Sequence, residues 1–289
     1  MMIREKCKLE QFNNSIDDID KNNELASHKM IDKISEDSLS KTFRVVKKDT
    51  LEVFRIRVFS FENFKKLENI FKTEVLSMTA ISHPNIMKFY KYEYGEVKTA
   101  LMQKDAETES LSYFLSKNNS AKSENIVIKI ILGLCQAIEC LHELEIVHKY
   151  INPMNIFVQN GVVKLSNFFE GFLFDKSLSS IEQIQYFSPE QIKKENLDER
   201  SDIFSLGLIF YELATGKKPF NTSKHLKSSE IERNIVEENT TIPSLYNLDL
   251  SSELEKMILK CLEKDKDDRY QTITILKNSL ESYIFKNKL

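Results

Sequence analysis

Glycine is scarce in this sequence, and its scarcity limits what the chain can bind. Only six glycines occur among 289 residues, whereas average usage would give about 20. Glycine-rich loops hold phosphate because their backbone N–H groups can approach an anion without an obstructing Cβ atom. A function built on such a loop is therefore not expected.

Long apolar runs and a strong excess of one charge are also absent. No apolar run approaches the roughly 20 residues that a membrane helix requires, and the start, MMIREKCKLEQF, lacks the apolar core of a signal peptide. The net charge of −3, with both signs interspersed, offers no basic field to nucleic acid or anionic lipid. We therefore expect a cytoplasmic protein that has neither nucleic acid nor membrane as a main partner.

Cysteines are few and show no metal-binding pattern. The four are Cys7, Cys135, Cys140 and Cys261, without a CxxC pair among them. Cys135 and Cys140 fall within one helical pattern. Reduced thiols are therefore expected in place of a metal site or disulfides.

Strand signals fill the first third of the chain after a polar start. Residues 1–28 mix charges of both signs without sustained periodicity, which predicts a flexible or loosely docked extension. The runs TFRVV and EVFRIRVF, separated by the turn-like KKDT, predict a hairpin. Helical spacing follows at Phe64, Leu67, Phe71 and Met78, and IMKFYKYEY and TALMQK predict two more strands.

The remainder of the chain is predicted to be helical. Ser123 can cap a long helix with one apolar face. Ser201 can cap DIFSLGLIFYELATG, which is apolar nearly all round and ends at Gly216, as expected of a helix in the middle of a lobe. Ser252 and Glu255 form a candidate capping box ahead of LEKMILKCLEK.

A series of short motifs resembles the protein kinase family, in the order in which that family carries them. HPNIMKFY (83–90) resembles HPNIVKLY, VHKYINPMNIFV (147–158) resembles the catalytic loop VHRDLKPENILV, and VKLSNFF (163–169) resembles VKIxDFG. Later in the chain, YFSPE (186–190), RSDIFSLGLIFYELATGKKPF (200–220) and Arg269 resemble the end of the activation segment, the αF region and a late arginine.

This resemblance implies an α+β, bilobal protein kinase-like fold over residues 29–285. The small β-rich N-lobe, with its αC helix, is expected over about residues 29–103. The large, mainly α-helical C-lobe is expected over about residues 106–285, and residues 1–28 form the polar extension.

The resemblance also implies a nucleotide cleft, and its phosphate loop has changed. Ser35, Asp37 and Ser40 stand at the three glycine positions of the family's GxGxxG loop. Their Cβ atoms obstruct the approach to phosphate, and Glu36 and Asp37 add negative charge that repels it. Phosphate binding by this loop is not expected.

The rest of the cleft is altered too. Arg57 stands at the VAIK lysine and Arg55 at the preceding alanine, which lies over adenine in kinases. Because strand residues two apart share a face, both are expected to point into the cleft; alternatively, Arg55 turns to solvent. Glu74 fits the αC glutamate and needs a cationic partner, for which Arg57 is suited. Met102 aligns with the gatekeeper.

In the catalytic loop, Tyr150 stands where the family has its catalytic aspartate. A phenol has a pKa near 10 and cannot replace the carboxylate that accepts a substrate hydroxyl proton. Asn152 replaces the lysine that steadies the transferred phosphate. These changes predict loss of phosphoryl transfer.

The metal-binding positions hold neutral amides. Asn155 matches the family's metal-binding asparagine, whereas Asn167 stands at the DFG aspartate. Mg²⁺ prefers anionic oxygen, so no metal is expected here. Glu170 or Asp175 could in principle supply the missing carboxylate, although nothing in their spacing demands it.

Several matched positions have structural roles in the family. His148, Phe168 and Met78 correspond to its regulatory spine, and Asp202 to the aspartate that holds the catalytic loop's backbone. Glu190 and Arg269 correspond to the ion pair that anchors the activation segment. For each of these, simple packing or a surface pair is a compatible alternative.

The resemblance therefore implies a pseudokinase that acts as a scaffold or allosteric regulator of a protein partner, such as an active kinase. No cofactor is expected, and Mg·ATP binding is weak or absent. One alternative is an unorthodox ATP-dependent Ser/Thr protein kinase, or another nucleotide-using transferase, with carboxylates recruited from elsewhere. Another is an ATP-sensing switch without transfer.

Candidate partner surfaces are the N-terminal extension, the αC helix and the polar segment 221–247, which alternatively is a solvated insertion. Lys149 stands at the arginine that contacts a phosphorylated activation loop, and Ser177, Ser179 and Ser180 lie in the corresponding segment. A phosphoserine contact with Lys149 and a plain polar loop both remain open.

Overall fold

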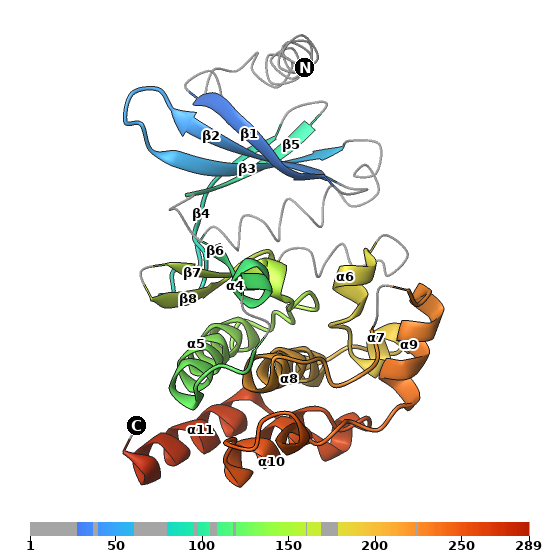
Figure 1. Cartoon of the computed structure of the whole chain (residues 1–289). Helices are drawn as coiled ribbons and strands as arrows, with labels where there is room; N and C mark the ends of the chain where they lie inside the picture. The colour runs from blue at the N-terminus through green and yellow to red at the C-terminus, as the bar shows by residue number, and fades with distance from the viewer. Residues whose placement is uncertain are drawn as a thin grey trace. The chain divides into compact units, whose positions relative to one another are not determined.

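A five-stranded antiparallel sheet in the order β1-β2-β3-β5-β4 organises the N-terminal of two units in this computed structural model (Figure 1). The structure describes residues 28–36, 40–60, 80–94, 98–104, 109–117, 120–159, 161–168, 179–222 and 225–288. The N-terminal unit comprises residues 1–81 and 88–107, and the C-terminal unit comprises residues 82–87 and 108–289.

The strands of the large sheet arise from alternating β-branched and aromatic residues. They are β1 (His28–Glu36), β2 (Ser40–Lys47), β3 (Val53–Ser60), β4 (Phe89–Tyr94) and β5 (Lys98–Lys104). The predicted hairpin is confirmed as β2 and β3, and the two further strands are confirmed as β4 and β5. The predicted helix around Phe71 lies outside the described residues.

One face of this sheet forms a small apolar core. Its buried members come from three neighbouring strands and are Phe43, Val45, Phe54, Ile56 and Met102. Met30 and Val58 are partly buried against them. The alternation of side chains along a strand therefore places Arg55 and Arg57 on the opposite face.

The C-terminal unit is mainly helical. Its helices are α4 (Leu111–Lys117), α5 (Glu124–His142), α6 (Ile181–Ile184), α7 (Pro189–Lys193), α8 (Glu199–Thr215), α9 (Ser228–Glu237), α10 (Ser252–Cys261) and α11 (Ile273–Asn287). Short 3-10 turns are η3 (Pro153–Asn155), η6 (Pro243–Leu245) and η7 (Lys266–Asp268). A small sheet in the order β6-β7-β8 contains β6 (Glu109–Ser110), β7 (Ile156–Gln159) and β8 (Val162–Leu165).

Helix α8 forms the centre of the C-terminal unit, as its all-round apolar sequence predicted. It packs against α5, α10 and α11 (Figure 1), and its C-cap, Gly216, has the left-handed φ of 69°. The predicted cap Ser201 is wrong, because the helix begins earlier and Asp198 accepts a hydrogen bond from the Arg200 N–H at 3.0 Å. Ser201 instead lies inside the helix and is buried.

The N-terminal boundary of α10 differs by one residue from the prediction, whereas that of α5 agrees with it. In α10 the cap is Ser251, whose hydroxyl accepts from the Leu254 N–H at 3.3 Å, so the predicted box at Ser252 is one residue late. Ser123 does precede α5, but its side chain makes no capping hydrogen bond. In α10, Ser251 and Ser252 are adjacent and both are residue types suited to an N-cap, so the sequence alone does not decide between them.

Helix α5 is long and apolar enough to span a membrane, although the sequence shows no uninterrupted apolar run of that length. Among the described residues, it is one helix whose length and mean hydropathy of 1.5 would suffice to cross a membrane. Lys129 and Glu139 interrupt its apolar residues, which is why no long run was evident. Most of this helix is buried inside the C-terminal unit. A helix in the core of a globular protein can have the same length and apolar composition as a membrane-spanning one.

Residues 82–87 join the C-terminal unit by pairing with β8. The Met87 N–H donates to the Leu165 carbonyl at 2.7 Å, and the Leu165 N–H donates to the Asn85 carbonyl at 2.8 Å. The Asn85 side chain also donates to the Val163 carbonyl at 2.9 Å. A Cβ atom on Gly133 of α5 would lie 2.9 Å from Asn85 Nδ2, so glycine permits this close packing.

Candidate functional site

The loop of residues 148–155 is fixed to the helical core through Asp202 in α8. Its carboxylate accepts hydrogen bonds from the backbone N–H groups of His148 and Lys149, each at 2.8 Å. His142, at the end of α5, donates to the same carboxylate from Nε2 at 2.9 Å. Asp202 is 1% exposed, so its charge is matched by three donors in a site that water does not reach. Its predicted contact with the loop backbone is thus present.

Lys149 adopts a left-handed backbone conformation within this loop, with a φ of 63°. This region is unfavourable for a residue with a Cβ atom. Asp202 holds the N–H of Lys149, and Gln191 of α7 donates from Nε2 to its carbonyl at 2.7 Å. Strained residues persist where the surroundings fix them from both sides, and the loop is therefore tightly positioned.

His148 is completely buried and connects the loop to the strand-end residues 166–168. Its Nδ1 accepts from the Tyr150 N–H at 3.2 Å, so the ring proton lies on Nε2, which donates to the Ser166 carbonyl at 3.0 Å. Burial lowers the pKa of His148, although the charge of Asp202 opposes that shift. Its ring packs edge-on against Phe168 at 6.5 Å. Two of the three predicted spine residues thus meet.

Tyr150 lies buried between the loop and the segment that precedes α7. Its phenol oxygen is 2.8 Å from Ser179 Oγ, and its ring packs edge-on against Phe187 with centroids 5.8 Å apart. Only 7% of the residue is exposed. At the position where the family has its catalytic base, the structure therefore places a phenol hydroxyl that already has a hydrogen-bond partner.

The asparagine side chains of the site bond to one another and to the loop. Asn167 donates from Nδ2 to Asn155 Oδ1 at 2.8 Å, and Asn155 donates from Nδ2 to the Tyr150 carbonyl at 2.9 Å. Asn152 donates to that same carbonyl at 3.0 Å and accepts from the Met154 N–H at 2.9 Å. The two residues predicted at the metal positions are thus brought together, as a pair of amides.

The electrostatics of this group do not favour a divalent cation. Asn155 and Asn167 carry no charge, and the Asn155 amide oxygen already accepts a hydrogen bond. Within the part of the chain that the structure describes, no cluster of three or more His, Cys, Asp or Glu side chains occurs, although Mg²⁺ held with substrate phosphates needs only one or two carboxylates. The alternative ligands Glu170 and Asp175 lie outside the described residues. The described residues therefore do not fit Mg²⁺.

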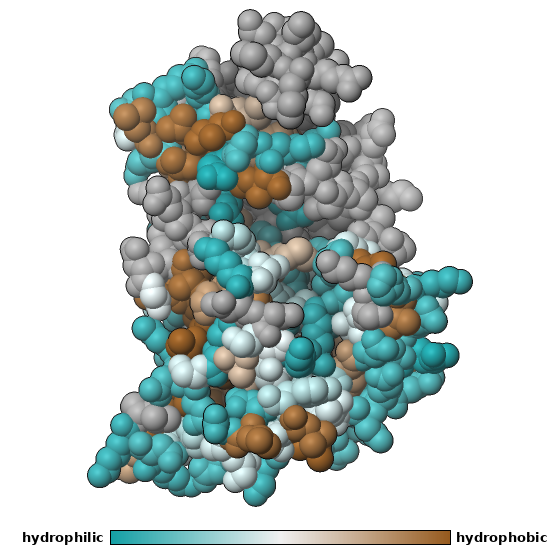
Figure 2. All heavy atoms as spheres, in the orientation of Figure 1, coloured by the Kyte–Doolittle hydropathy of each residue, from teal (hydrophilic) through white to brown (hydrophobic). Residues whose placement is uncertain are grey.

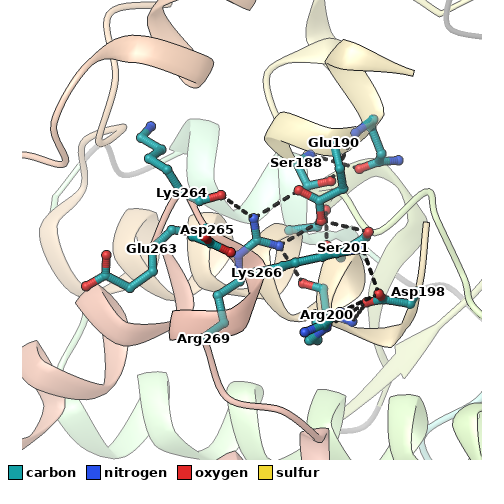
Figure 3. A network of polar contacts seen from close by, with 12 residues as sticks. Ser188, Glu190, Asp198, Arg200, Ser201, Glu263, Lys264, Asp265, Lys266 and Arg269 are labelled. Carbon is teal, nitrogen blue, oxygen red and sulfur yellow. Dashed lines mark hydrogen bonds and ion pairs between the residues drawn. The ribbon is translucent and has the colours of Figure 1, made fainter. Parts of the chain in front are cut away.

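Glu190 of α7 and Arg269, which directly follows η7, form a buried ion pair in the same unit (Figure 3). The guanidinium donates from Nη1 and Nη2 to the two carboxylate oxygens, at 2.7 and 2.9 Å. Its other three N–H groups donate to the carbonyls of Arg200, Glu263 and Lys264, so all five donors are used. This predicted anchor is present, with an Arg269 side chain that is 0% exposed.

Several residues predicted for the nucleotide cleft belong to the N-terminal unit. Ser35 and Ser40 lie at the facing ends of β1 and β2, and Arg55 and Arg57 lie on β3. Met102 pairs with Ile56 and is buried in the core, so the register places it on the face opposite the two arginines. Three further predicted residues lie outside the described residues, namely Asp37, Glu74 and Met78.

Sequence reasoning overlooked three partners in the helical unit. His142 belongs to none of the motifs, yet it bonds to Asp202 across 60 residues of sequence. Gln191 holds the carbonyl of Lys149, and Ser179 bonds to the Tyr150 phenol. From the sequence, this serine is either part of a plain polar loop or a phosphorylation candidate. No local pattern signals such contacts, because the partners are distant along the chain.

Residues 28–280 match the family model described as protein kinase domain. A probable serine/threonine-protein kinase of Clostridium perfringens, CPE1738, is 30% identical over 227 residues, which cover 76% of this chain and 33% of that protein. The serine/threonine-protein kinase PknB of Mycolicibacterium smegmatis is 30% identical over 224 residues, or 73% of this chain and 35% of that protein. The chain thus spans about a third of the length of these curated relatives.

Among solved structures, the kinase domain of PknI from Mycobacterium tuberculosis, crystallised as a double mutant, has a similar fold. The TM-score is 0.67 with 15% sequence identity, and the match covers 89% of this chain and 95% of that one. At this identity the similarity concerns the fold alone. It agrees with the predicted α+β architecture of a small β-rich lobe and a large helical lobe.

Proposed function

The chain belongs to the protein kinase domain family, and from that premise we propose that it is a pseudokinase that works by binding a protein partner. In this proposal the kinase fold serves as a scaffold or allosteric regulator, for example of an active kinase. The observation that carries it is the set of uncharged side chains at Tyr150, Asn155 and Asn167, which bond to the chain itself.

Phosphoryl transfer depends mainly on positioning and on neutralising charge with metal ions and cations. A base must accept the proton of the substrate hydroxyl, and a phenol with a pKa near 10 does so poorly at neutral pH. The phenol of Tyr150 also has a partner in Ser179 at 2.8 Å. This arrangement supports the loss of base catalysis.

The metal positions support the same proposal. Mg²⁺ is normally bound through one or two carboxylates together with substrate phosphates. Asn155 and Asn167 instead bond amide to amide at 2.8 Å. Binding Mg²⁺ would require that hydrogen bond to break without gaining an anionic ligand, so weak or absent binding of Mg·ATP is expected.

A second candidate is an active serine/threonine kinase, and the relatives favour it. Proteins named as serine/threonine kinases are 30% identical over about three quarters of this chain. Asn155 persists at a metal position, and a carboxylate outside the described residues could complete the site. Such an enzyme would transfer phosphate from ATP in spite of Tyr150.

Two measurements on the full chain separate these candidates. The first is thermal melting with Mg·ATP, with metal-free ATP and with neither. A ligand at 100 times its dissociation constant stabilises the native state by about 2.7 kcal/mol, so an absent shift supports the pseudokinase. A shift without transfer, with or without metal, would identify an ATP-sensing switch.

The second measurement is transfer of label from γ-labelled ATP to a generic basic protein substrate. The unaltered chain should show none. Transfer that disappears in Asn155→Ala would refute the pseudokinase proposal. The double variant Tyr150→Asp, Asn167→Asp restores both carboxylates, and any label it transfers would identify these positions as the cause of inactivity. Asn278→Ala, on the exposed surface of α11, is the matched control.

A further inference from the structure

The C-terminal unit displays an apolar surface on the turn between α9 and α10. We define the 242–248 patch by its four exposed members, Ile242, Leu245, Tyr246 and Leu248, which are 49%, 71%, 50% and 90% exposed. Single exposed apolar side chains are common, but four within seven residues are unusual for a surface with no binding role. Figure 2 shows brown, apolar side chains gathered along the lower edge of the C-terminal unit.

The turn that carries the patch is held firmly from beneath. Pro243 and Leu250 are buried, and the Asn247 side chain donates to the Ala214 carbonyl at 2.8 Å. The Ser244 N–H donates to Glu255 Oε2 at 2.7 Å, and the Ser251 N–H donates to Glu124 Oε1 at 2.7 Å. Side chains on a pre-organised backbone lose less conformational entropy on binding. The backbone that carries the patch is thus held in place before a partner binds.

Three members of the patch recur at intervals of three residues, namely Ile242, Leu245 and Leu248. Only Pro243–Leu245 form the 3-10 helix η6, and residues 246–250 continue as turns and bends. Two turns of an α-helix present an apolar stripe about 11 Å long, so a short amphipathic helix can contact side chains that are carried by one such turn.

The charge around the patch specifies the partner further. Residues 233–256 contain five carboxylates and two cations, Arg233 and Lys256, one at each end. Exposed members of this acidic rim are Glu237, Glu238, Asp249 and Glu253. Lys286 of α11 approaches Glu253 at 3.7 Å, so it offsets one of these charges, and the carboxylates still outnumber the three cations. The rim is net acidic.

We propose that the 242–248 patch is a docking site for an amphipathic helix of a partner protein that carries Lys and Arg beside its apolar stripe. Large aliphatic side chains of the partner helix, such as leucine, would cover the patch. The Lys and Arg side chains of the partner helix would face the acidic rim. This inference deepens the proposed binding function, on which it rests for its biological role. It does not depend on whether the chain transfers phosphate.

The test uses a fluorescently labelled probe peptide of Leu and Lys at helical spacing, about 18 residues long so that it can form a helix. A matched peptide has Glu in place of every Lys. Binding to the full chain is followed by fluorescence anisotropy at two salt concentrations. The Leu/Lys peptide should bind, more weakly at high salt, and the Leu/Glu peptide should not.

Three variants locate the binding. Leu245→Ser with Leu248→Ser should weaken binding at least about tenfold, since two buried leucine contacts are lost. Glu237→Lys with Asp249→Lys should weaken it without altering the apolar residues. The control is Leu51→Ser, which changes a 73% exposed leucine of the N-terminal unit and should leave binding unchanged. Circular dichroism verifies that each variant is folded.

Other results would overturn the proposal. The proposal is wrong if the Leu/Lys peptide does not bind or if both peptides bind equally. It is also wrong if the substitutions at Leu245 and Leu248 leave binding unchanged. Sedimentation of the free chain tests a second copy as the occupant. Self-association that Leu245→Ser with Leu248→Ser abolishes would assign the patch to a homodimer instead. The melting and label-transfer results remain independent of all these outcomes.

Discussion

Replacing Arg269 with alanine tests how the C-terminal unit is held together. The guanidinium is fully buried, and its removal would leave the carboxylate of Glu190, whose side chain is 4% exposed, without its cation. Ser201 would still donate to Glu190 Oε1 at 2.8 Å, but one hydroxyl does not balance a buried charge. The carbonyls of Arg200, Glu263 and Lys264 would also lose their donor.

Breaking a buried pair by removing one partner destabilises proteins by roughly 3–5 kcal/mol. We therefore expect Arg269→Ala to lower the free energy of unfolding by about 4 kcal/mol. A typical domain has only about 5–15 kcal/mol in total, so this variant should unfold at a much lower urea concentration. Because the chain has no tryptophan, far-UV circular dichroism is the suitable signal.

A double-mutant cycle isolates the pair. Glu190→Gln removes the charge with little change of shape, and the double variant with Arg269→Ala should lose less than the sum of the single losses, by about 1–3 kcal/mol. The control is Lys286→Ala, which breaks the exposed contact with Glu253 at 3.7 Å and should change stability by less than about 1 kcal/mol. Equal effects of Arg269→Ala and Lys286→Ala, or strict additivity in the cycle, would refute this reasoning.

Three further predictions concern the same unit. Burial alone would raise the pKa of Glu190, but the hydrogen bonds and charge of Arg269 hold it below its usual range. The ionised Glu190 therefore contributes its full stabilisation above the unfolded pKa of about 4.3. This contribution is lost as the pH falls through the lower folded pKa. In Arg269→Ala, the free energy of unfolding should therefore decrease less steeply with falling pH. Asp202→Asn should weaken protection from hydrogen exchange at the His148 and Lys149 amides, because a carboxylate that accepts from both is replaced by a neutral amide. The buried hydroxyl of Tyr211 has no hydrogen-bond partner among the described residues, so Tyr211→Phe should raise the free energy of unfolding by about 1 kcal/mol in a urea titration; a loss of similar size would contradict this.

Much of the fold was predictable because local patterns and packing agree. The alternation in TFRVV and EVFRIRVF predicted β2 and β3, since one face of each strand must be buried. The all-round apolar sequence of α8 predicted a helix surrounded by others, and Gly216 marked its end because a C-cap takes a left-handed φ. Helix starts were less predictable. Asp198 and Ser201 are both suitable caps, and only tertiary contacts, here Ser201 with Glu190, decide between them.

The candidate site was predictable only as a set of positions. The motifs placed Tyr150, Asn155 and Asn167 near one another, and the structure agrees. The motifs did not reveal that the two amides would bond to each other, or that Ser179 would meet the phenol 29 residues away. The gatekeeper role of Met102 stays a prediction. The structure pairs Met102 with Ile56 and buries it in the apolar core, on the face of the sheet opposite Arg55 and Arg57.

The path of the chain through residues 82–87 affects how the protein can be divided. This short stretch belongs to the helical unit, although the chain on both sides of it belongs to the sheet unit. A fragment that comprises residues 108–289 alone would lack the stretch that pairs with β8. The Leu165 N–H and carbonyl would lose their backbone partners, and the Val163 carbonyl would lose the Asn85 amide. A fragment meant to contain the whole helical unit should therefore include residues 82–87. One design joins residue 87 to residue 108 through a linker that replaces residues 88–107.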